Sequence, residues 1–95
     1  MTQLVFSPAA LADLDAIWDF SADKWSADKA DGYVDHIFEA CADLSKGRKS
    51  GRRVEIRDGY LKYGVGSHLI FYRKHNNLLE VIRILHGKMD MERHL

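Results

Sequence analysis

The segment Ser67–His86, SHLIFYRKHNNLLEVIRILH, decides the fold of this 95-residue chain. It contains two runs rich in β-branched and aromatic residues, Leu69–Tyr72 and Val81–Leu85. Asn76 and Asn77 lie between these runs, and because asparagine tolerates a positive φ, the pair favours a tight hairpin turn. The segment therefore predicts two antiparallel strands at the centre of a small sheet.

Two amphipathic helices are predicted before this β-hairpin. Ser7 is a good N-cap and Pro8 suits the first helical position. Ser26 can cap a second helix, which ends at Lys46 and Gly47 because glycine permits a left-handed cap. The connection between the helices is short, so they should form an antiparallel helical hairpin. The apolar positions expected to face the core are Leu11, Leu14, Ile17, Trp18 and Trp25 in the first helix, and Ala30, Tyr33, Val34, Ile37, Phe38, Cys41 and Leu44 in the second.

The remaining elements complete an α+β fold. Gln3–Phe6 is expected to form a first strand, and Tyr60–Val65 alternates as another. Asp90 can cap a last helical turn, Met91–Leu95. The order of elements predicts a single domain over residues 1–95, in which an antiparallel two-helix hairpin packs on a small, mostly antiparallel four-stranded sheet. The chain should end in a short helical turn.

Composition favours a cytoplasmic protein. No apolar run approaches the roughly 20 residues of a membrane span. The N-terminus has no basic region and its apolar run is too short for a signal peptide. The single cysteine, Cys41, cannot form an internal disulfide. We therefore expect a cytoplasmic location and no contact with a membrane.

Charge is divided between the two halves of the chain, although the formal net charge is zero. Residues 1–45 hold two basic and nine acidic residues, a net charge of −7, and residues 46–95 hold twelve basic and five acidic residues, a net charge of +7. Either the halves attract each other, or the basic half forms a face for an acidic partner or a nucleic acid. The loop around Lys46, Arg48, Lys49, Arg52 and Arg53 is either solvated or attracts phosphate or carboxylate groups.

The β-hairpin places arginines within apolar strands. Arg73 and Arg83 are costly there unless each reaches an acid, a carbonyl group or water. His86 ends the second strand, where it could cap the strand or act in chemistry. The other histidines show no compact metal-binding spacing, so neither a metal nor a cofactor is expected.

Three stretches resemble ParE-type toxins of the RelE/ParE toxin–antitoxin superfamily. The first is Ser7-Pro8-Ala9-Ala10-x-Ala12-Asp13-Leu14-x-x-Ile17-Trp18. The second is Gly66-Ser67-His68-x-x-Phe71-Tyr72-Arg73. The third, and most specific, is Ile82-Arg83-Ile84-Leu85-His86-Gly87-x-Met89-Asp90-x-x-Arg93-His94-Leu95. Together they cover nearly the whole chain in the order typical of the family.

The resemblance implies the toxin of a type II toxin–antitoxin pair that inhibits DNA gyrase. It also implies a ParD-like antitoxin, which would lay a helix in a groove or add a strand at a sheet edge. DNA would then be reached only through the antitoxin. The basic tail should project beyond the sheet with little core to form, so the candidates for contact with the target are Lys88, Met89, Arg93 and His94. The candidates for contact with the antitoxin are Arg57, Lys62, Arg73 and Arg83.

Two alternatives remain open within the superfamily. One is a RelE-like, ribosome-dependent mRNA endonuclease, in which His86 would act as the base and Arg73 or Arg83 would clamp the phosphate. No tyrosine follows Tyr72, however, and a C-terminal tyrosine often contributes in that branch. The other alternative is an inactive member that binds its antitoxin only. For the gyrase inhibitor we expect no catalytic residue.

Overall fold

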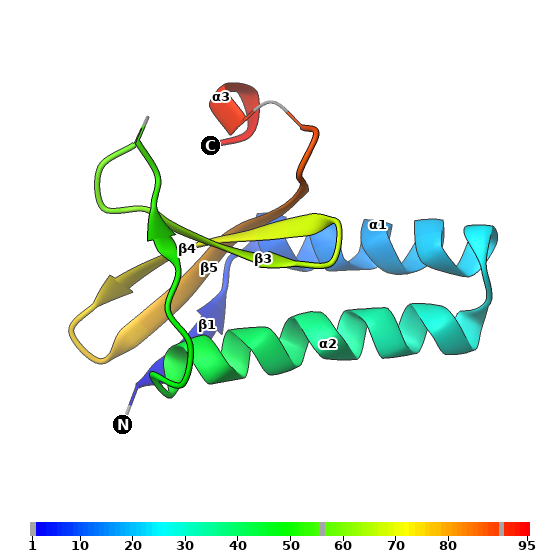
Figure 1. Cartoon of the computed structure of the whole chain (residues 1–95), viewed down its shortest axis with the longest axis horizontal. Coiled ribbons are helices and arrows are strands. Elements are labelled where there is room, and N and C mark those ends of the chain that lie inside the picture. The colour runs from blue at the N-terminus through cyan, green and yellow to red at the C-terminus, as the bar shows by residue number, and fades with distance from the viewer. Residues whose placement is uncertain (1, 56, 90) are drawn as a thin grey trace.

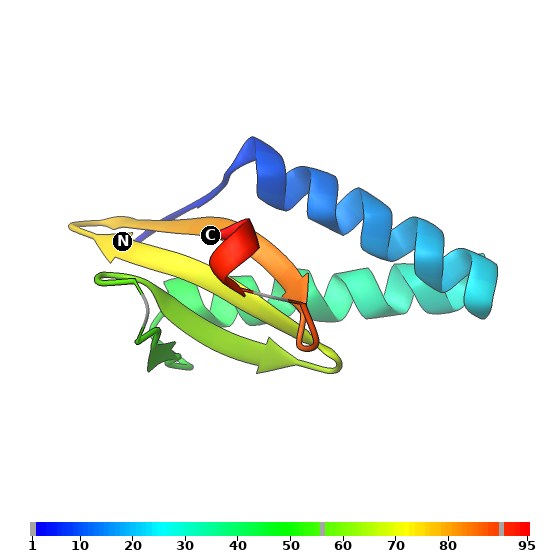
Figure 2. The ribbon, with the colours of Figure 1, turned by 90° about the horizontal axis from the view of Figure 1, so that it is seen from above.

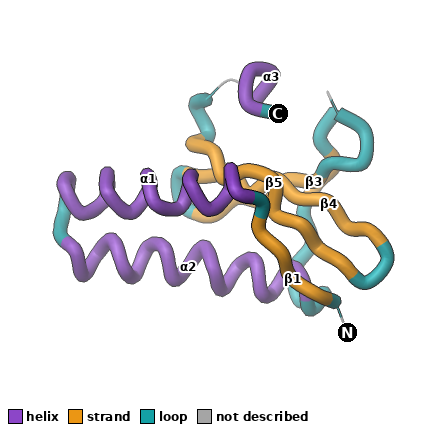
Figure 3. Tube along the Cα trace, turned by 180° about the vertical axis from the view of Figure 1, so that it is seen from behind, coloured by secondary structure: helices purple, strands orange, loops and turns teal. Residues whose placement is uncertain are grey.

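The computed structural model describes residues 2–55, 57–89 and 91–95. Helices α1 and α2 cover one face of a sheet, and the short α3 lies over the other face (Figures 1 and 3). In chain order the elements are β1 (Gln3–Phe6), α1 (Pro8–Lys24), α2 (Ala27–Ser45), β2 (Arg52–Arg53), β3 (Leu61–Val65), β4 (His68–His75), β5 (Leu78–His86) and α3 (Met91–His94). The predicted α+β architecture is confirmed. No helix of the described residues is long and apolar enough to cross a membrane.

The sheet has five strands in the order β1-β5-β4-β3-β2, so the prediction of four strands was wrong by one. β1 pairs with β5 in parallel, and the other pairs are antiparallel. The additional strand is β2, whose two arginines pair with Lys62 and Leu61 of β3. Two charged residues carry no alternating apolar pattern, so this strand could not be found from sequence. Its pairing depends on the tertiary approach of the preceding loop to β3.

The β4–β5 hairpin turns where predicted. His75 pairs with Leu78, and Asn76 adopts a φ of 54° in the two-residue turn. A register shift lies opposite Phe71 and Tyr72, where β5 contains one extra residue. Such a bulge sharpens the local twist of the sheet. The hairpin is the most extensively paired part of the sheet, as the opening segment of sequence predicts.

The strands present apolar side chains to both faces of the sheet. On the face toward the helices, Ile70, Tyr72, Leu79, Val81 and Ile84 are buried with residues of α1 and α2. On the opposite face a smaller cluster is formed by Val54, Phe71 and Leu85, with Tyr60, Leu69 and Leu95 packed against it. The chain therefore has one main core and a second, smaller core beneath α3.

Both helix starts and the second helix end follow the predicted caps. The Ser7 hydroxyl accepts a hydrogen bond from the Ala10 amide at 3.0 Å, and the Ser26 hydroxyl accepts one from the Lys29 amide at 3.2 Å. Gly47 adopts a φ of 77° directly after the Lys46 C-cap. The proposed cap of the last helical turn, Asp90, lies outside the described residues, but the turn itself is present as α3.

The apolar stripe of α1 is narrower than predicted. Leu14 and Ile17 are buried, but Leu11 and Trp25 are 48% and 52% exposed. Figure 2 shows that the helical hairpin extends past the end of the sheet, and Trp25 is the C-cap residue that ends α1. In α2, Phe38 is also 41% exposed and contacts Phe6 edge-on at 5.4 Å.

Candidate functional site

Arg83 joins three parts of the molecule. Its Nε and Nη2 donate to the Asp13 carboxylate at 2.7 and 2.8 Å, and its Nη1 donates to the His94 carbonyl at 3.2 Å. The side chains of Arg83 and Asp13 are 22% and 15% exposed. The hydrogen bond to Asp13 raises the pKa of Arg83, so the guanidinium is held in its charged form. The arginine of β5 thus ties together α1, the sheet and the C-terminal tail.

Asp13 also closes the open edge of β5. β1 ends at Phe6, which pairs with Val81, so the later residues of β5 have no neighbouring strand on that side. The Asp13 carboxylate accepts the Ile84 amide at 2.9 Å, and the Ser7 hydroxyl donates to the Ile82 carbonyl at 2.6 Å. The beginning of α1 therefore supplies the hydrogen bonds that a longer β1 would have made.

The C-terminal tail is attached to the sheet, and the expectation that it has little core to form was wrong for Leu95. Leu95 packs against the smaller core, and His94 is held through its carbonyl. Lys88 and Met89 are exposed, and their amides donate to His86 at Nδ1 (3.1 Å) and at the carbonyl (2.9 Å). Of the predicted target contacts, Lys88, Met89 and Arg93 are exposed, and the first two lie on the turn that these hydrogen bonds fix.

A cavity of about 320 Å³ lies between α1 and the end of β5. Its polar lining consists of Asp13, His68 and His86, and the two histidines are paired across β4 and β5 with their ring centroids 5.3 Å apart. The Tyr33 hydroxyl of α2 lies 2.6 Å from Nδ1 of His68. The cavity is lined by Asp13, Ala16, Ile17, Phe20, His68, Ile84, His86 and Met89.

Tyr33 is fixed in place by the β3–β4 turn. Its hydroxyl accepts the Ser67 amide at 3.2 Å. Gly66 adopts a φ of 55°, and a Cβ there would lie 2.8 Å from the Tyr33 ring. Only glycine combines that backbone conformation with this close approach. The His68 imidazole therefore has a defined partner at Nδ1.

We expect the stability of the chain to fall as the pH is lowered from 7 to 5, with His68 as a main cause. Burial lowers the pKa of His68 below 6.5, the neighbouring His86 lowers it further, and Asp13 opposes the shift. Below about 6.5 the unfolded state therefore binds the proton more readily, so the stability present above this pH is lost as the pH falls. Thermal unfolding should show a smaller acid-induced fall for His68→Gln than for the natural chain.

The matched control is His36→Gln. His36 is an exposed histidine on α2, and its side chain is 74% exposed. This variant should keep the full acid-induced fall in melting temperature. The same fall in His68→Gln as in His36→Gln would show that the buried histidine has no part in the effect.

On the opposite face of the sheet, two predicted antitoxin contacts lie close to one aromatic ring. The guanidinium groups of Arg57 and Arg73 lie 5.7 and 5.5 Å from the centroid of Tyr60. Arg73 also pairs with Glu80 at 3.0 Å. Tyr60 packs against the smaller core, so the cluster is anchored to the sheet.

The three residues proposed for an mRNA endonuclease are not brought together. In the β4–β5 pairing, Arg73 lies opposite Glu80 and His86 lies opposite His68. Arg73 and His68 are five residues apart on β4, so the backbones of Arg73 and His86 are separated by about 17 Å at ~3.4 Å per residue. His86 lines the cavity beside α1, and Arg73 contacts Tyr60 on the other face. Arg83 is already paired with Asp13. The described residues also contain no group of three or more histidine, cysteine, aspartate or glutamate side chains that could hold a metal ion.

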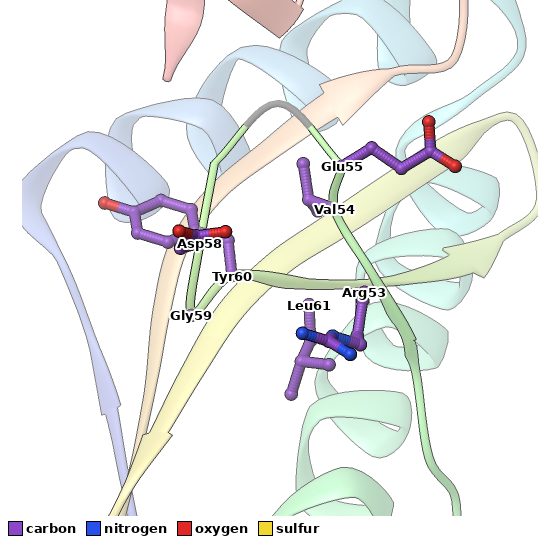
Figure 4. A pocket seen from close by; sticks show the side chains of 7 residues that line it. All are labelled: Arg53, Val54, Glu55, Asp58, Gly59, Tyr60 and Leu61. Carbon is purple, nitrogen blue, oxygen red and sulfur yellow. The ribbon is translucent and has the colours of Figure 1, made fainter.

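A larger cavity, of about 600 Å³, lies beside β2 and β3, at the edge of the sheet. Figure 4 shows the side chains of Arg53 and Glu55 extending to opposite sides of the β3 ribbon. The lining is mixed in charge and consists of Arg53, Val54, Glu55, Asp58, Gly59, Tyr60 and Leu61. Lys62 lies next to it, opposite Arg52 of β2.

The helical hairpin exposes large apolar side chains. Phe20 is 64% exposed and Trp25 52% exposed, and the ammonium group of Lys24 lies over both rings at 5.7 and 5.1 Å. Leu11 and Phe38 are exposed to a similar extent to Trp25. Phe20, Lys24 and Trp25 thus form a small exposed aromatic cluster at the end of α1, the kind of apolar group that a partner protein can cover.

Comparison with known proteins identifies the family. The family model described as "ParE toxin of type II toxin-antitoxin system, parDE" matches residues 4–91. The chain belongs to the ParE toxin family. As a ParE toxin it is the toxin component of a type II toxin–antitoxin system.

Individual ParE proteins are similar over almost the whole length. Toxin ParE1 of Mycobacterium tuberculosis is 38% identical over 96 residues, covering 99% of this chain and 98% of the relative. Toxin ParE1 of Caulobacter vibrioides is 34% identical over 90 residues, covering 94% and 93%. A solved chain titled "Chromosomal ParDE TA system from P. aeruginosa" superposes with a TM-score of 0.80 at 26% identity, covering 90% of this chain and 96% of that chain.

Sequence reasoning missed two residues that organise this ParE site. Asp13 was part of a family motif but had no assigned role, although it neutralises Arg83 and caps β5. Tyr33 was assigned to the core, yet its hydroxyl contacts His68. One available signal was charge: an arginine in an apolar strand requires a partner, and the other half of the chain holds nine acids.

Proposed function

We propose that this toxin inhibits DNA gyrase in the cytoplasm by binding it, without chemistry of its own, and that a ParD-like antitoxin neutralises it. The observation that carries the proposal is the dispersal of the candidate catalytic groups, since His86 and Arg73 lie on opposite faces of the sheet. This dispersal supports action by contact with the target rather than by RNA cleavage. Membership of the ParE family supports gyrase as the target.

The accessible turn after β5 is the proposed contact with gyrase. Lys88 and Met89 are exposed there, and the Met89 side chain is 41% exposed. The turn is held by two hydrogen bonds to His86. A cation next to a flexible apolar side chain can pack into a pocket of a partner while the charge orients it. Arg93 and His94 would support this contact from α3.

Two surfaces are proposed for the antitoxin. The exposed apolar groups of the helical hairpin suit the apolar face of an amphipathic helix. On the other face of the sheet, Arg57 and Arg73 suit an acidic segment that continues beyond this helix. The ParDE neighbour supports an antitoxin of this kind as partner. Arg83 would affect antitoxin binding only indirectly, because its guanidinium already donates hydrogen bonds to Asp13 and to the His94 carbonyl. Lys62 lies apart, at the β2–β3 edge.

A supercoiling assay tests this function directly. Purified gyrase, relaxed plasmid, ATP and the antitoxin-free toxin should give loss of supercoiling or trapped cleaved DNA, and added antitoxin should reverse the effect. If the folded toxin has no effect on gyrase, the proposal fails. Cleavage of mRNA on translating ribosomes would then be the next activity to measure.

A further inference from the structure

The edge of the sheet formed by β2 and β3 carries uncompensated positive charge. Arg52 lies directly opposite Lys62, and Arg53 follows on the same edge strand. Among the described residues, none of these three side chains takes part in an ion pair. Lys49, from the preceding loop, lies over the Tyr63 ring of β3 at 5.7 Å. We call Lys49, Arg52, Arg53 and Lys62 the basic edge.

Among the described residues, the acidic half of the chain forms no ion pair with the basic edge, although Asp43 lies near enough to Lys49 to raise its pKa. Only two ion pairs of the described residues connect the halves, Arg83 with Asp13 and Arg48 with Asp43. Neither pair includes a residue of the basic edge. Attraction between the halves therefore accounts for little of this cluster of cations, which is largely exposed to solvent and accessible to a partner with negative charge.

The basic edge is held rigidly in place. The Gly51 amide donates to the hydroxyl of Tyr72 at 2.8 Å, and Tyr72 is only 2% exposed. A Cβ at Gly51 would lie 2.5 Å from the Lys62 carbonyl oxygen, so only glycine lets the loop lie this close to β3. A hydrogen bond to Tyr63 raises the pKa of Lys49. The backbone that carries these cations is therefore fixed, whereas the side chains of Arg52, Arg53 and Lys62 would become ordered on binding.

We propose that the basic edge binds the phosphate backbone of duplex DNA. Arg52 and Lys62 share one face of the sheet, whereas Lys49 covers Tyr63 on the face that packs toward the helices. The cations therefore lie on both faces of the sheet at this edge. Duplex DNA presents about one negative charge per ~1.7 Å of its axis, a continuous line of charge that such an edge can follow.

The aromatic residues near the basic edge favour a duplex over a single strand. Single-stranded nucleic acids are bound largely by stacking of bases on free aromatic rings. Here the ring of Tyr63 is covered by Lys49, and the ring of Tyr60 is flanked by Arg57 and Arg73. Glu55 and Asp58 line the adjacent cavity and would repel a phosphate backbone from that side (Figure 4). The surface thus matches backbone contact without base stacking.

The basic edge would contact DNA directly, whereas the sequence suggested contact with DNA only through the antitoxin. The test uses fluorescence anisotropy of a labelled 20-base-pair duplex with the antitoxin-free, full-length toxin between 50 and 200 mM salt. Arg52→Ala/Lys62→Ala should weaken binding at least about tenfold at low salt and reduce the salt slope by about two. Lys24→Ala/Lys29→Ala removes the same charge from the exposed end of the helical hairpin and should leave both quantities unchanged.

Other outcomes would overturn the proposal. These are no binding of the duplex, tighter binding of single-stranded DNA or RNA, and equal effects of the two double variants. If Arg52→Ala/Lys62→Ala binds the antitoxin more weakly but binds DNA as tightly as the natural chain, the basic edge binds an acidic protein segment instead. Circular dichroism verifies folding, and Arg52→Gln, at an exposed position, gives a second test with an expected slope change of about one. Gyrase is absent from this measurement, so its result is separate from that of the supercoiling assay.

Discussion

Replacing Asp13 by alanine is expected to lower the free energy of unfolding by about 2–4 kcal/mol. The substitution leaves the largely buried Arg83 guanidinium without its carboxylate and the Ile84 amide without its acceptor. For a chain of this size the melting temperature should fall by about 10–20 °C. Denaturant unfolding followed by circular dichroism measures the change.

The control for this prediction is Asp15→Ala, an exposed acid two residues further along α1. It should change the free energy of unfolding by no more than about 0.5 kcal/mol. Arg83→Met combined with Asp13→Ala should recover part of the loss, since an apolar side chain leaves no unpaired charge. If Asp13→Ala is as stable as Asp15→Ala, the ion pair contributes nothing, and packing with the hydrogen bonds of Ser7 holds α1 to β5.

The double substitution Lys88→Glu/Met89→Ala is expected to reduce inhibition of supercoiling by at least about tenfold, which corresponds to about 1.4 kcal/mol of lost binding energy. Lys88 and Met89 are exposed, so their replacement should change stability little. Affinity for the antitoxin should fall less than affinity for gyrase, because among the proposed antitoxin contacts only Phe20 lines the same cavity as Met89. Titration of the toxin in the supercoiling assay and of the antitoxin by calorimetry gives both quantities.

Point substitutions are more informative here than removal of the whole tail. Deleting residues 88–95 also removes Leu95 from the smaller core and the His94 carbonyl from Arg83. A deleted chain that loses both toxicity and antitoxin binding would therefore report unfolding. Lys29→Glu, which reverses one exposed charge on α2, is the control for the double substitution. Full inhibition by Lys88→Glu/Met89→Ala would exclude this turn as the gyrase contact.

This small domain presents several separate surfaces to its surroundings. The exposed apolar groups lie on the helical hairpin, which extends beyond the sheet, whereas the tail and the basic edge lie along the sheet itself (Figures 1 and 2). Antitoxin, target and DNA could thus engage different parts of one small domain. The Arg83–Asp13 pair, with the hydrogen bond from Arg83 to the His94 carbonyl, connects the helical hairpin to the tail.

The sequence by itself determined the local structure. Ser7 with Pro8, Ser26, Gly47 and Asn76 mark helix ends and a turn because caps and turns depend on the side chain and backbone preferences of a few adjacent residues. The alternating apolar runs fixed the β4–β5 hairpin in the same way. The family motifs were likewise contiguous, so membership of the ParE family was predictable before the fold was known.

Only the tertiary structure decided which of these residues meet. Asp13 and Arg83 are 70 residues apart in the chain, and Tyr33 and His68 are 35 apart, so no local pattern could pair them. The two-residue β2 exists because Gly51 can approach β3 and Tyr72, which is a matter of packing between distant segments. The same reason separates His86 from Arg73: strand register and the alternation of side chains set their distance and their faces.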